Sequence, residues 1–282
     1  MKKPRKLLRA GRLSALSVLT VTALAVATVP ASAEDVGAQV FQEVHGTATG
    51  STAVPYHYSG ALLLDHFYFR YTDSDHHLTH LEALPSSADR LFVAFEDKNG
   101  DDQYEYRVAH QRIPSTGVVA GHLYRSGCHG YCRTKISVPV GDYVFVISGF
   151  SFLFADDDHH IDEIRISELN GYLTHAFNDK NDDDEYSAIV DYYWVPRSHF
   201  SFFETLYGTP AHRGQATRDV PAGDKVIREF AVKNIENGGE ADNHIKRFGF
   251  LTNSTTIDIY YGDKDPTDSG YWSYRLSYAI LK

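Results

Sequence analysis

Short segments of apolar and aromatic residues recur along the whole chain, and Gly, Pro, Asn or Asp closes most of them. Examples are LFVAFED (91–97), YEYRVAH (104–110), YVFVISGFSFLF (143–154), IDIYYGD (257–263) and YWSYRLSYAIL (271–281). Segments of this length that are rich in aromatic and β-branched residues are typical of β-strands. The 3.6-residue apolar spacing of an amphipathic helix does not persist anywhere in the sequence. The pattern therefore predicts an all-β protein.

One polar pattern returns three times among these segments, an Asp/His loop followed by an Asp-rich turn. The copies are DHHL (75–78) with FEDKNGDD (95–102), DHHI (158–161) with FNDKNDDD (177–184), and DNHI (242–245) with YGDKD (261–265). The last His of the loop precedes the aromatic residue by 18 positions in the first copy and by 17 in the other two. A fixed period of this kind indicates repeated structural units.

We therefore expect three tandem, internally repeated antiparallel β-sandwich-like modules of about 80 residues each. Their expected bounds are 34–115, 116–197 and 198–282. A single closed assembly with threefold pseudosymmetry, in which each repeat supplies one sector, is the alternative. Five or six strands per unit are enough for a small sandwich, and the length of the units favours separate modules.

Residues 1–33 have the pattern of a secretory signal peptide. Six basic residues come first, an apolar run follows from Leu13 to Val29, and Ala31-Ser32-Ala33 forms a small-residue cleavage site. This order predicts cleavage before Glu34 and a secreted, extracellular protein; an uncleaved anchor helix is the alternative. No later stretch approaches the roughly 18 apolar residues that a membrane-spanning helix needs.

Loss of the signal peptide would make an acidic chain more acidic. The full sequence has 27 Lys and Arg against 37 Asp and Glu, and residues 1–33 hold six of the basic residues and none of the acidic ones. The remainder has 21 basic and 37 acidic residues, a formal net charge of −16. A surface with this charge repels nucleic acid and anionic lipid, so the composition argues against nucleic-acid binding.

The two cysteines of the sequence, Cys128 and Cys132, lie in GCHGYC. In an oxidising compartment we expect a disulfide between them across the glycine-containing loop. A metal site that also uses His129 is the alternative, but this segment alone supplies too few ligands.

The Asp-rich turns are candidate calcium sites, because alternating oxygen ligands on a tight turn bind hard cations. The candidate ligands are Asp97, Asn99, Asp101, Asp179, Asn181, Asp183, Asp263 and Asp265. The turns lack the flanking helices and the glutamate of an EF-hand. Asn99-Gly100 is also a strong β-hairpin signal, so hairpin turns without metal are the favoured interpretation and calcium is the alternative.

The histidines and lysines of the repeat, with neighbouring aromatic residues, form a second set of candidates. These are Asp75, His77, Lys98 and Tyr104 in the first copy, Asp158, His160, Lys180 and Tyr186 in the second, and Asp242, His244, Lys264 and Trp272 in the third. A structural role for the histidines is favoured over zinc, because adjacent residues of an extended chain point to opposite faces. The functional alternative is one polar patch with an aromatic face per module, which suits sugar hydroxyls.

These features predict a secreted, noncatalytic, multivalent binding protein for carbohydrate or another cell-surface ligand. The sequence lacks the G-x-S-x-G, H-E-x-x-H and glycine-rich phosphate-loop motifs of common enzyme classes. A secreted metal-dependent hydrolase that uses an Asp/His cluster is the alternative, since groups that converge only in space leave no linear motif. A toxin-like or assembly subunit whose strands pair with a partner is a third possibility.

Overall fold

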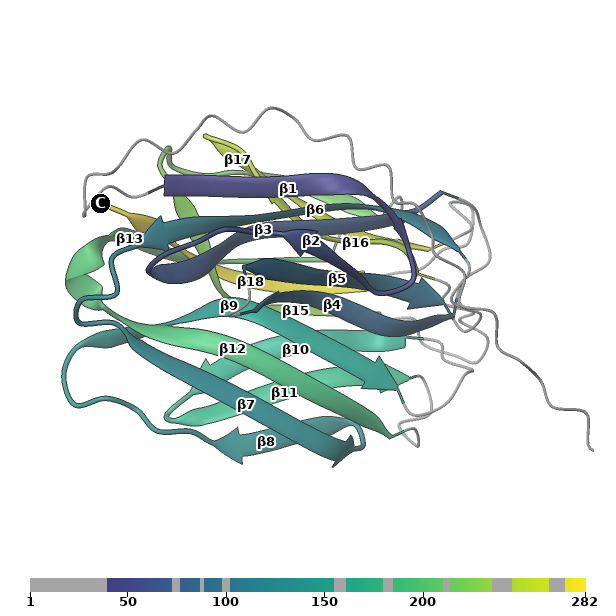
Figure 1. Cartoon of the computed structure of the whole chain (residues 1–282), viewed down its shortest axis with the longest axis horizontal. Coiled ribbons are helices and arrows are strands. Elements are labelled where there is room, and N and C mark those ends of the chain that lie inside the picture. Colours follow the sequence, from purple (N-terminus) through teal and green to yellow (C-terminus); the bar gives the residue numbers. More distant parts are fainter. Residues whose placement is uncertain are drawn as a thin grey trace, which may run out of the picture. The chain divides into compact units, whose positions relative to one another are not determined.

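The computed structural model describes residues 40–72, 77–86, 89–97, 102–154, 161–179, 185–209, 214–234, 245–263 and 272–282. These residues form eighteen β-strands and one 3-10 turn, Arg197–His199, so the all-β prediction is confirmed (Figure 1). Among them, no helix has the length and apolarity needed to cross a membrane. The predicted signal peptide lies outside the described residues.

The strands fall into three consecutive groups of six. The first group is β1 (Val40–Thr49), β2 (Thr52–Pro55), β3 (Ala61–Tyr71), β4 (Leu78–Ser86), β5 (Arg90–Asp97) and β6 (Gln103–Ile113). The second is β7 (Val119–Cys128), β8 (Tyr131–Lys135), β9 (Tyr143–Phe154), β10 (Ile161–Leu169), β11 (Tyr172–Asp179) and β12 (Tyr186–Pro196). The third is β13 (Phe200–Gly208), β14 (Gln215–Asp219), β15 (Lys225–Asn234), β16 (Ile245–Thr252), β17 (Thr256–Asp263) and β18 (Trp272–Leu281).

Three six-stranded antiparallel sheets are built by exchange of strands between the groups. The first sheet has the order β1-β6-β3-β16-β17-β14, the second β7-β12-β9-β4-β5-β2, and the third β13-β18-β15-β10-β11-β8. In every sheet, the first, sixth and third strands of one group are followed by the fourth, fifth and second strands of another.

This arrangement differs from the expected row of separate sandwiches, because each of the three sheets joins strands from two of the expected modules. The physical reason is the third strand of each group. β3, β9 and β15 pair on one side with a strand of their own group and on the other with β16, β4 and β10, respectively. Residues 33–282 accordingly belong to one compact unit. A shared core buries more apolar surface than three small cores of this length.

Three phenylalanines from equivalent positions of β3, β9 and β15 meet in this shared core. The ring centroids of Phe67 and Phe150 are 4.9 Å apart, those of Phe67 and Phe230 are 5.3 Å apart, and those of Phe150 and Phe230 are 5.6 Å apart. All three rings are buried. Their tilted and edge-to-face contacts are the arrangements that aromatic quadrupoles favour.

β-Bulges recur at equivalent points of the three groups. The pairing between the third and sixth strands skips Asp65 in β3, Ser148 in β9 and Arg228 in β15. The pairing between the fourth and fifth strands is likewise irregular at the start of β4, β10 and β16. A bulge re-aims the side chains beside it. The bulges in β3, β9 and β15 therefore mark equivalent positions in the three sheets.

Candidate functional site

Most of the predicted loop and turn residues lie outside the described residues. They are Asp75, Lys98, Asn99, Asp101, Asp158, His160, Lys180, Asn181, Asp183, Asp242, His244, Lys264 and Asp265. The backbone pairing of Asp179 and Asp263 is described, but their side chains are not.

In each copy, the residue that follows the Asp/His loop pairs with the Asp at the start of the Asp-rich turn. Leu78, the residue after the loop in the first copy, pairs with Asp97. The corresponding pairs are Ile161 with Asp179 and Ile245 with Asp263. These three pairs occupy equivalent ends of the pairing between the fourth and fifth strands of each group.

Asp97 has a structural role in the first of these pairs. The carboxylate is buried, and its Oδ1 accepts a hydrogen bond from the backbone N–H of His77 at 2.9 Å. A carboxylate that satisfies a backbone donor in this way ties His77 to the end of β5. The favoured hairpin interpretation is wrong, because β5 and β6, β11 and β12, and β17 and β18 lie in different sheets, so each Asp-rich turn connects two sheets.

The three aromatic residues predicted to border a ligand are core residues. Tyr104, Tyr186 and Trp272 are almost fully buried. The hydroxyl of Tyr104 donates to the carbonyl of Gly50 at 2.7 Å, and that of Tyr186 lies 3.1 Å from the carbonyl of Gly130. Both contacts hold the turn between the first two strands of a group. These rings are therefore not accessible for stacking on a ligand.

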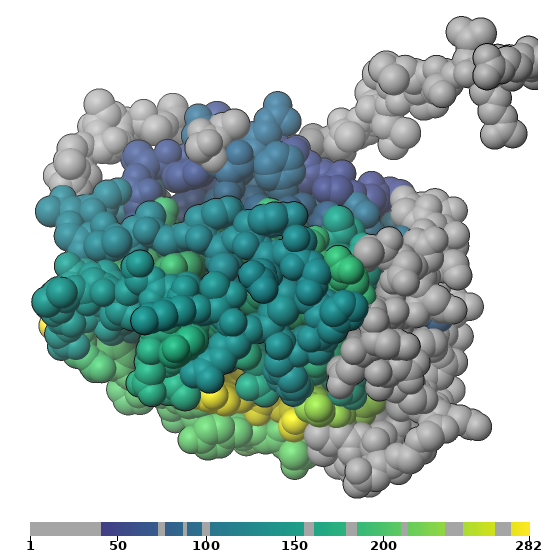
Figure 2. Space-filling model, turned by 90° about the horizontal axis from the view of Figure 1, so that it is seen from below, coloured from purple at the N-terminus to yellow at the C-terminus, as the bar shows by residue number. Residues whose placement is uncertain are grey.

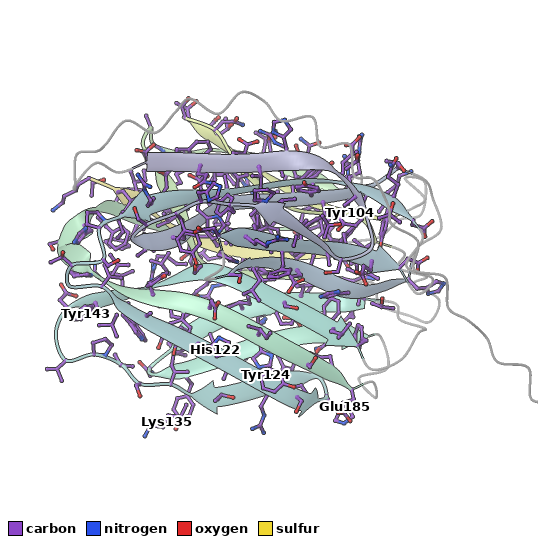
Figure 3. The ribbon with its side chains drawn as sticks, in the orientation of Figure 1. Tyr104, His122, Tyr124, Lys135, Tyr143 and Glu185 are labelled. Atoms are coloured by element: carbon purple, nitrogen blue, oxygen red, sulfur yellow. A yellow bond between two sulfur atoms is a disulfide. The ribbon has the colours of Figure 1, made fainter. Side chains whose placement is uncertain are left out.

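A hollow of about 340 Å³ lies on the second sheet and is the candidate site considered further. We call it the His122 hollow. Its lining is Tyr58, Leu62, Pro85, Ala120, Gly121, His122, Ser148, Asp191, Tyr192 and Tyr193. β7 and β12 supply most of these residues, and β9 and the segment from β2 to β3 supply others. Figure 2 views the molecule from the side on which β7 and β8 lie in Figure 1, and Figure 3 labels His122.

Small residues at the β9 bulge open this hollow. Ser148 and Gly149 occupy the bulge in the second sheet, where the first sheet has Asp65 and His66 and the third has Arg228 and Glu229. On β7, Gly121 occupies the position that Gln42 has in the first sheet and Glu204 has in the third. Because three larger polar side chains are replaced by small residues, the second sheet keeps an open volume at this point.

Gly121 is also required by Tyr192. A Cβ atom at position 121 would lie 2.2 Å from two atoms of the Tyr192 ring, which is closer than any relaxed carbon contact. The glycine therefore allows the ring to lie against β7, where it forms a side of the hollow.

His122 and Asp191 form the polar centre of the hollow. They are cross-strand partners on β7 and β12, and His122 Nδ1 lies 2.6 Å from Asp191 Oδ1. The His122 side chain is 62% exposed and that of Asp191 is 28% exposed, so the imidazole reaches solvent while the carboxylate is more enclosed. Burial raises the pKa of Asp191, and the hydrogen bond with His122 partly offsets that rise.

Two half-buried tyrosines border this pair. Burial raises the pKa of Tyr58 and of Tyr193, and the charge of Asp191 contributes to both shifts. The two phenols and the carboxylate all line the same hollow. The hollow thus combines aromatic surface with an acceptor-rich carboxylate and an exposed imidazole.

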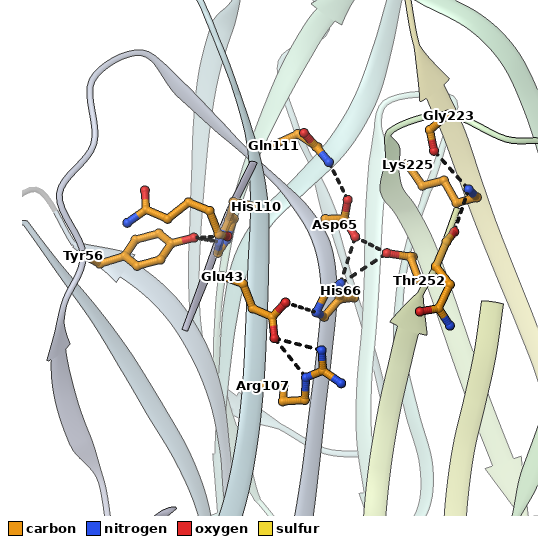
Figure 4. A network of polar contacts seen from close by, with 12 residues as sticks. Glu43, Tyr56, Asp65, His66, Arg107, His110, Gln111, Gly223, Lys225 and Thr252 are labelled. Atoms are coloured by element: carbon orange, nitrogen blue, oxygen red, sulfur yellow. Dashed lines mark hydrogen bonds and ion pairs between the residues drawn. The ribbon is translucent and has the colours of Figure 1, made fainter. Parts of the chain in front are cut away.

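The equivalent place on the first sheet is filled by a buried polar network (Figure 4). Asp65 Oδ1 lies 2.9 Å from His66 Nδ1, and Gln111 Nε2 donates to Asp65 Oδ2 at 2.7 Å. The hydroxyl of Thr252 also donates to Asp65. With its oxygens satisfied and little exposure, this carboxylate stabilises the sheet and leaves no room for a ligand.

The first sheet also supports the floor of the His122 hollow. His110 Nε2 lies 2.8 Å from the carbonyl oxygen of Ser148, and His110 Nδ1 lies 2.7 Å from the hydroxyl of Tyr56. Burial lowers the pKa of His110 to about 4, so the imidazole is neutral. A neutral ring that donates from Nε2 accepts from Tyr56 at Nδ1. This contact holds the β9 bulge in place.

No protein-family model matches this chain, and no curated protein matches it at a significant level. The functional argument therefore depends on the geometry of the site.

Sequence reasoning missed the His122–Asp191 pair because its members are far apart along the chain and belong to no repeated motif. Their positions on strands carried a weak signal. Asp191 lies between the apolar residues Val190 and Tyr192, and period-two alternation directs it to the opposite face of the strand. The pairing of β7 with β12, which brings His122 to it, is a tertiary result.

Proposed function

We propose that this protein binds carbohydrate and that the His122 hollow is a binding site. The observation that carries the proposal is the hydrogen-bonded pair of His122 and Asp191 beside Tyr58 and Tyr193. Sugars present hydroxyl groups along their edges and apolar C–H faces. A carboxylate and an imidazole satisfy the hydroxyls, while a tyrosine ring supplies apolar contact and a polar tip.

The size and construction of the hollow suit one or two sugar rings. Its volume of about 340 Å³ is at the lower end of the range of small-ligand pockets, roughly 300–1,000 Å³. The polar pair lies on paired strands rather than on a loop, so its geometry is set before a ligand arrives. Preorganisation of this kind reduces the entropy lost on binding.

The wider proposal is a secreted, noncatalytic protein that binds an extracellular glycan. The signal-like residues 1–33 and the acidic composition support secretion and argue against nucleic-acid partners. The repeated Asp/His loops and Asp-rich turns are the proposed further contacts, and they would make binding multivalent. Calcium at the Asp-rich turns, in a structural role, is the proposed alternative to turns without metal.

A metal-independent hydrolase is the second candidate for the hollow, and the same pair favours it. A carboxylate that accepts from a histidine Nδ1–H is the orienting contact of histidine general bases. Ser148 lines the hollow, but it is buried. The described residues therefore do not place a nucleophilic hydroxyl at the solvent-facing side of His122. Binding without turnover is therefore the favoured function.

Glycan-array screening of the chain that begins at Glu34, followed by calorimetric titration of the best ligand, tests this proposal. Asp191→Asn should weaken binding about tenfold or more, since a hydrogen bond to a charged group contributes roughly 1.5–3 kcal/mol. Tyr58→Ala should weaken binding by removing a ring from the border of the hollow. Ser148→Asp, which introduces the residue found at the first-sheet bulge, should block the site.

Tyr207→Ala provides the matched control, because Tyr207 is a highly exposed ring on the third sheet, outside the hollow. It should leave the affinity unchanged. Equal affinity in Asp191→Asn and in the wild type would overturn the assignment of the hollow. Release of reducing sugar from the bound glycan would favour the hydrolase instead.

A further inference from the structure

Cys128, Cys132 and His175 meet at the turn between β7 and β8, which connects two sheets. The predicted disulfide between Cys128 and Cys132 is confirmed. Cys132 pairs directly with His175 across β8 and β11. The two sulfur atoms and a ring nitrogen of His175 all lie within 4.8 Å of one another. The histidine, which is distant in sequence, supplies the third ligand that the GCHGYC segment lacks.

Hydrogen bonding leaves the lone pair of His175 Nε2 without a partner among the described residues. The hydroxyl of Tyr186 lies 3.1 Å from the carbonyl oxygens of Gly130 and of His175, and 3.2 Å from His175 Nδ1. Its single hydrogen satisfies a carbonyl, and its oxygen then accepts from Nδ1–H. The other nitrogen, Nε2, is buried without a hydrogen-bond partner among the described residues. Metal-binding histidines have this arrangement, with one nitrogen held by a hydrogen bond and the other bare.

The same three positions in the other groups do not have this chemistry. In the first group, Ala48 lies opposite Tyr104, as Cys128 lies opposite Tyr186 in the second group. Thr52 likewise pairs with Val93 in the first group, as Cys132 pairs with His175 in the second. In the third group, the pair that corresponds to Cys132 and His175 is Ala216 and Ile259. At the compared positions, the other groups therefore have small or apolar residues. The two cysteines and the histidine replace them together, in one group.

We propose that Cys128, Cys132 and His175 Nε2 form a binding site for a thiophilic metal ion such as Zn²⁺ when the disulfide is reduced. A dithiol reductant would supply two electrons, convert the disulfide to two thiols and itself become a disulfide. Metal binding would then release the two thiol protons. Two thiolates and one imidazole are a known zinc ligand set, with the fourth position of the tetrahedron left for water or an added ligand.

The oxidised protein should bind metal poorly, because disulfide sulfur atoms carry no charge and are weak ligands. In a tetrahedral zinc site with usual bond lengths, the ligand atoms are separated by roughly 3.5–4 Å. Atoms that already lie within 4.8 Å of one another need only small side-chain rotations to reach this geometry. Cys128 is buried and Cys132 is partly exposed, so an ion would enter from the turn between β7 and β8.

Anaerobic titration of the reduced protein with Co²⁺, a coloured substitute for Zn²⁺, tests this proposal. The reduced wild type should bind one Co²⁺ per chain, with thiolate charge-transfer absorption and the strong visible bands of tetrahedral coordination. Zn²⁺ should remove both signals. The oxidised protein should show neither, and near-UV circular dichroism should report the folded state of every sample.

The other groups of the chain provide matched variants. Cys128→Ala combined with Cys132→Thr introduces the residues of the first group and should abolish the signals. His175→Val also introduces the first-group residue and should weaken Co²⁺ binding by at least about tenfold. His129→Ala should leave Co²⁺ binding unchanged, because the proposed ligand is His175.

Three results would overturn the proposal. One is a folded, reduced wild type without the cobalt bands. The second is loss of the bands in His129→Ala together with their retention in His175→Val. The third is reduced protein that unfolds and binds no Co²⁺. None of these results depends on whether the His122 hollow binds a sugar.

Discussion

The ring of Phe67 on β3 packs edge-on against the ring of Phe150 on β9, with centroids 4.9 Å apart and an interplanar angle of 69°. The two residues come from different groups of strands and from different sheets. Phe230 of the third group completes the contact. Every group therefore contributes to the same central cluster, and no group can lose its part of the cluster without affecting the other two.

Phe67→Ala should destabilise the whole chain in one cooperative transition. Removing a fully buried phenylalanine ring costs about 3–5 kcal/mol through lost burial and the resulting cavity. Urea unfolding followed by tyrosine fluorescence and by far-UV circular dichroism should show one coincident, shifted transition. Phe41→Ala, at a ring that is 50% exposed, should change the free energy of unfolding far less. Two separate transitions, with only one shifted, would contradict a shared core.

Asp97→Ala should destabilise the protein by about 1–3 kcal/mol, because the backbone N–H of His77 loses its acceptor. Asp97→Asn keeps an acceptor oxygen and should have a smaller effect. Thermal melts in EDTA and in Ca²⁺ should give the same difference between these variants and the wild type if the turn binds no metal. A loss that is much larger in Ca²⁺, and equal for both variants, would instead demonstrate calcium binding at the first turn.

Stability should fall as the pH is lowered from about 6.5 towards about 4, and His110 should contribute to this fall. Burial keeps its folded-state pKa below the unfolded value, so the unfolded chain takes up a proton first. The contribution at neutral pH is about 3 kcal/mol, and it is lost through this interval. Chemical denaturation at a series of pH values measures it. His110→Gln should flatten the slope, and an unchanged slope would exclude His110 as a contributor.

Gly121→Ala should damage the His122 hollow without removing any polar group from it. The new methyl group would meet the Tyr192 ring, which must then move. We expect a loss of about 1–3 kcal/mol in stability, as for other overpacked sites, and weaker binding of the ligand found by the glycan screen. Ser126→Ala, at an exposed position of β7 outside the hollow, serves as the control for both measurements. Normal affinity in Gly121→Ala would show that Tyr192 does not shape the site.

The amino-acid sequence by itself determined the strand content and the disulfide, since both depend on local information. Apolar alternation and β-branched residues specify strands within a few positions. Cys128 and Cys132 are brought together by a turn, since their sequence separation is 4. The spacing of the Asp/His loops and Asp-rich turns also predicted equivalent units. The equivalent strand order and bulges in the three groups are what such units require, while the duplication itself stays a prediction.

Only the tertiary structure decided which strands share a sheet and which polar residues meet. The pairing of β3, β9 and β15 with strands of another group depends on long-range burial, and period-two patterns do not specify a partner strand. For the same reason, the sequence could not show that Tyr104, Tyr186 and Trp272 face the core. Contacts such as His122 with Asp191 and Cys132 with His175 follow from strand register, which is set once neighbouring sheets have buried their apolar faces.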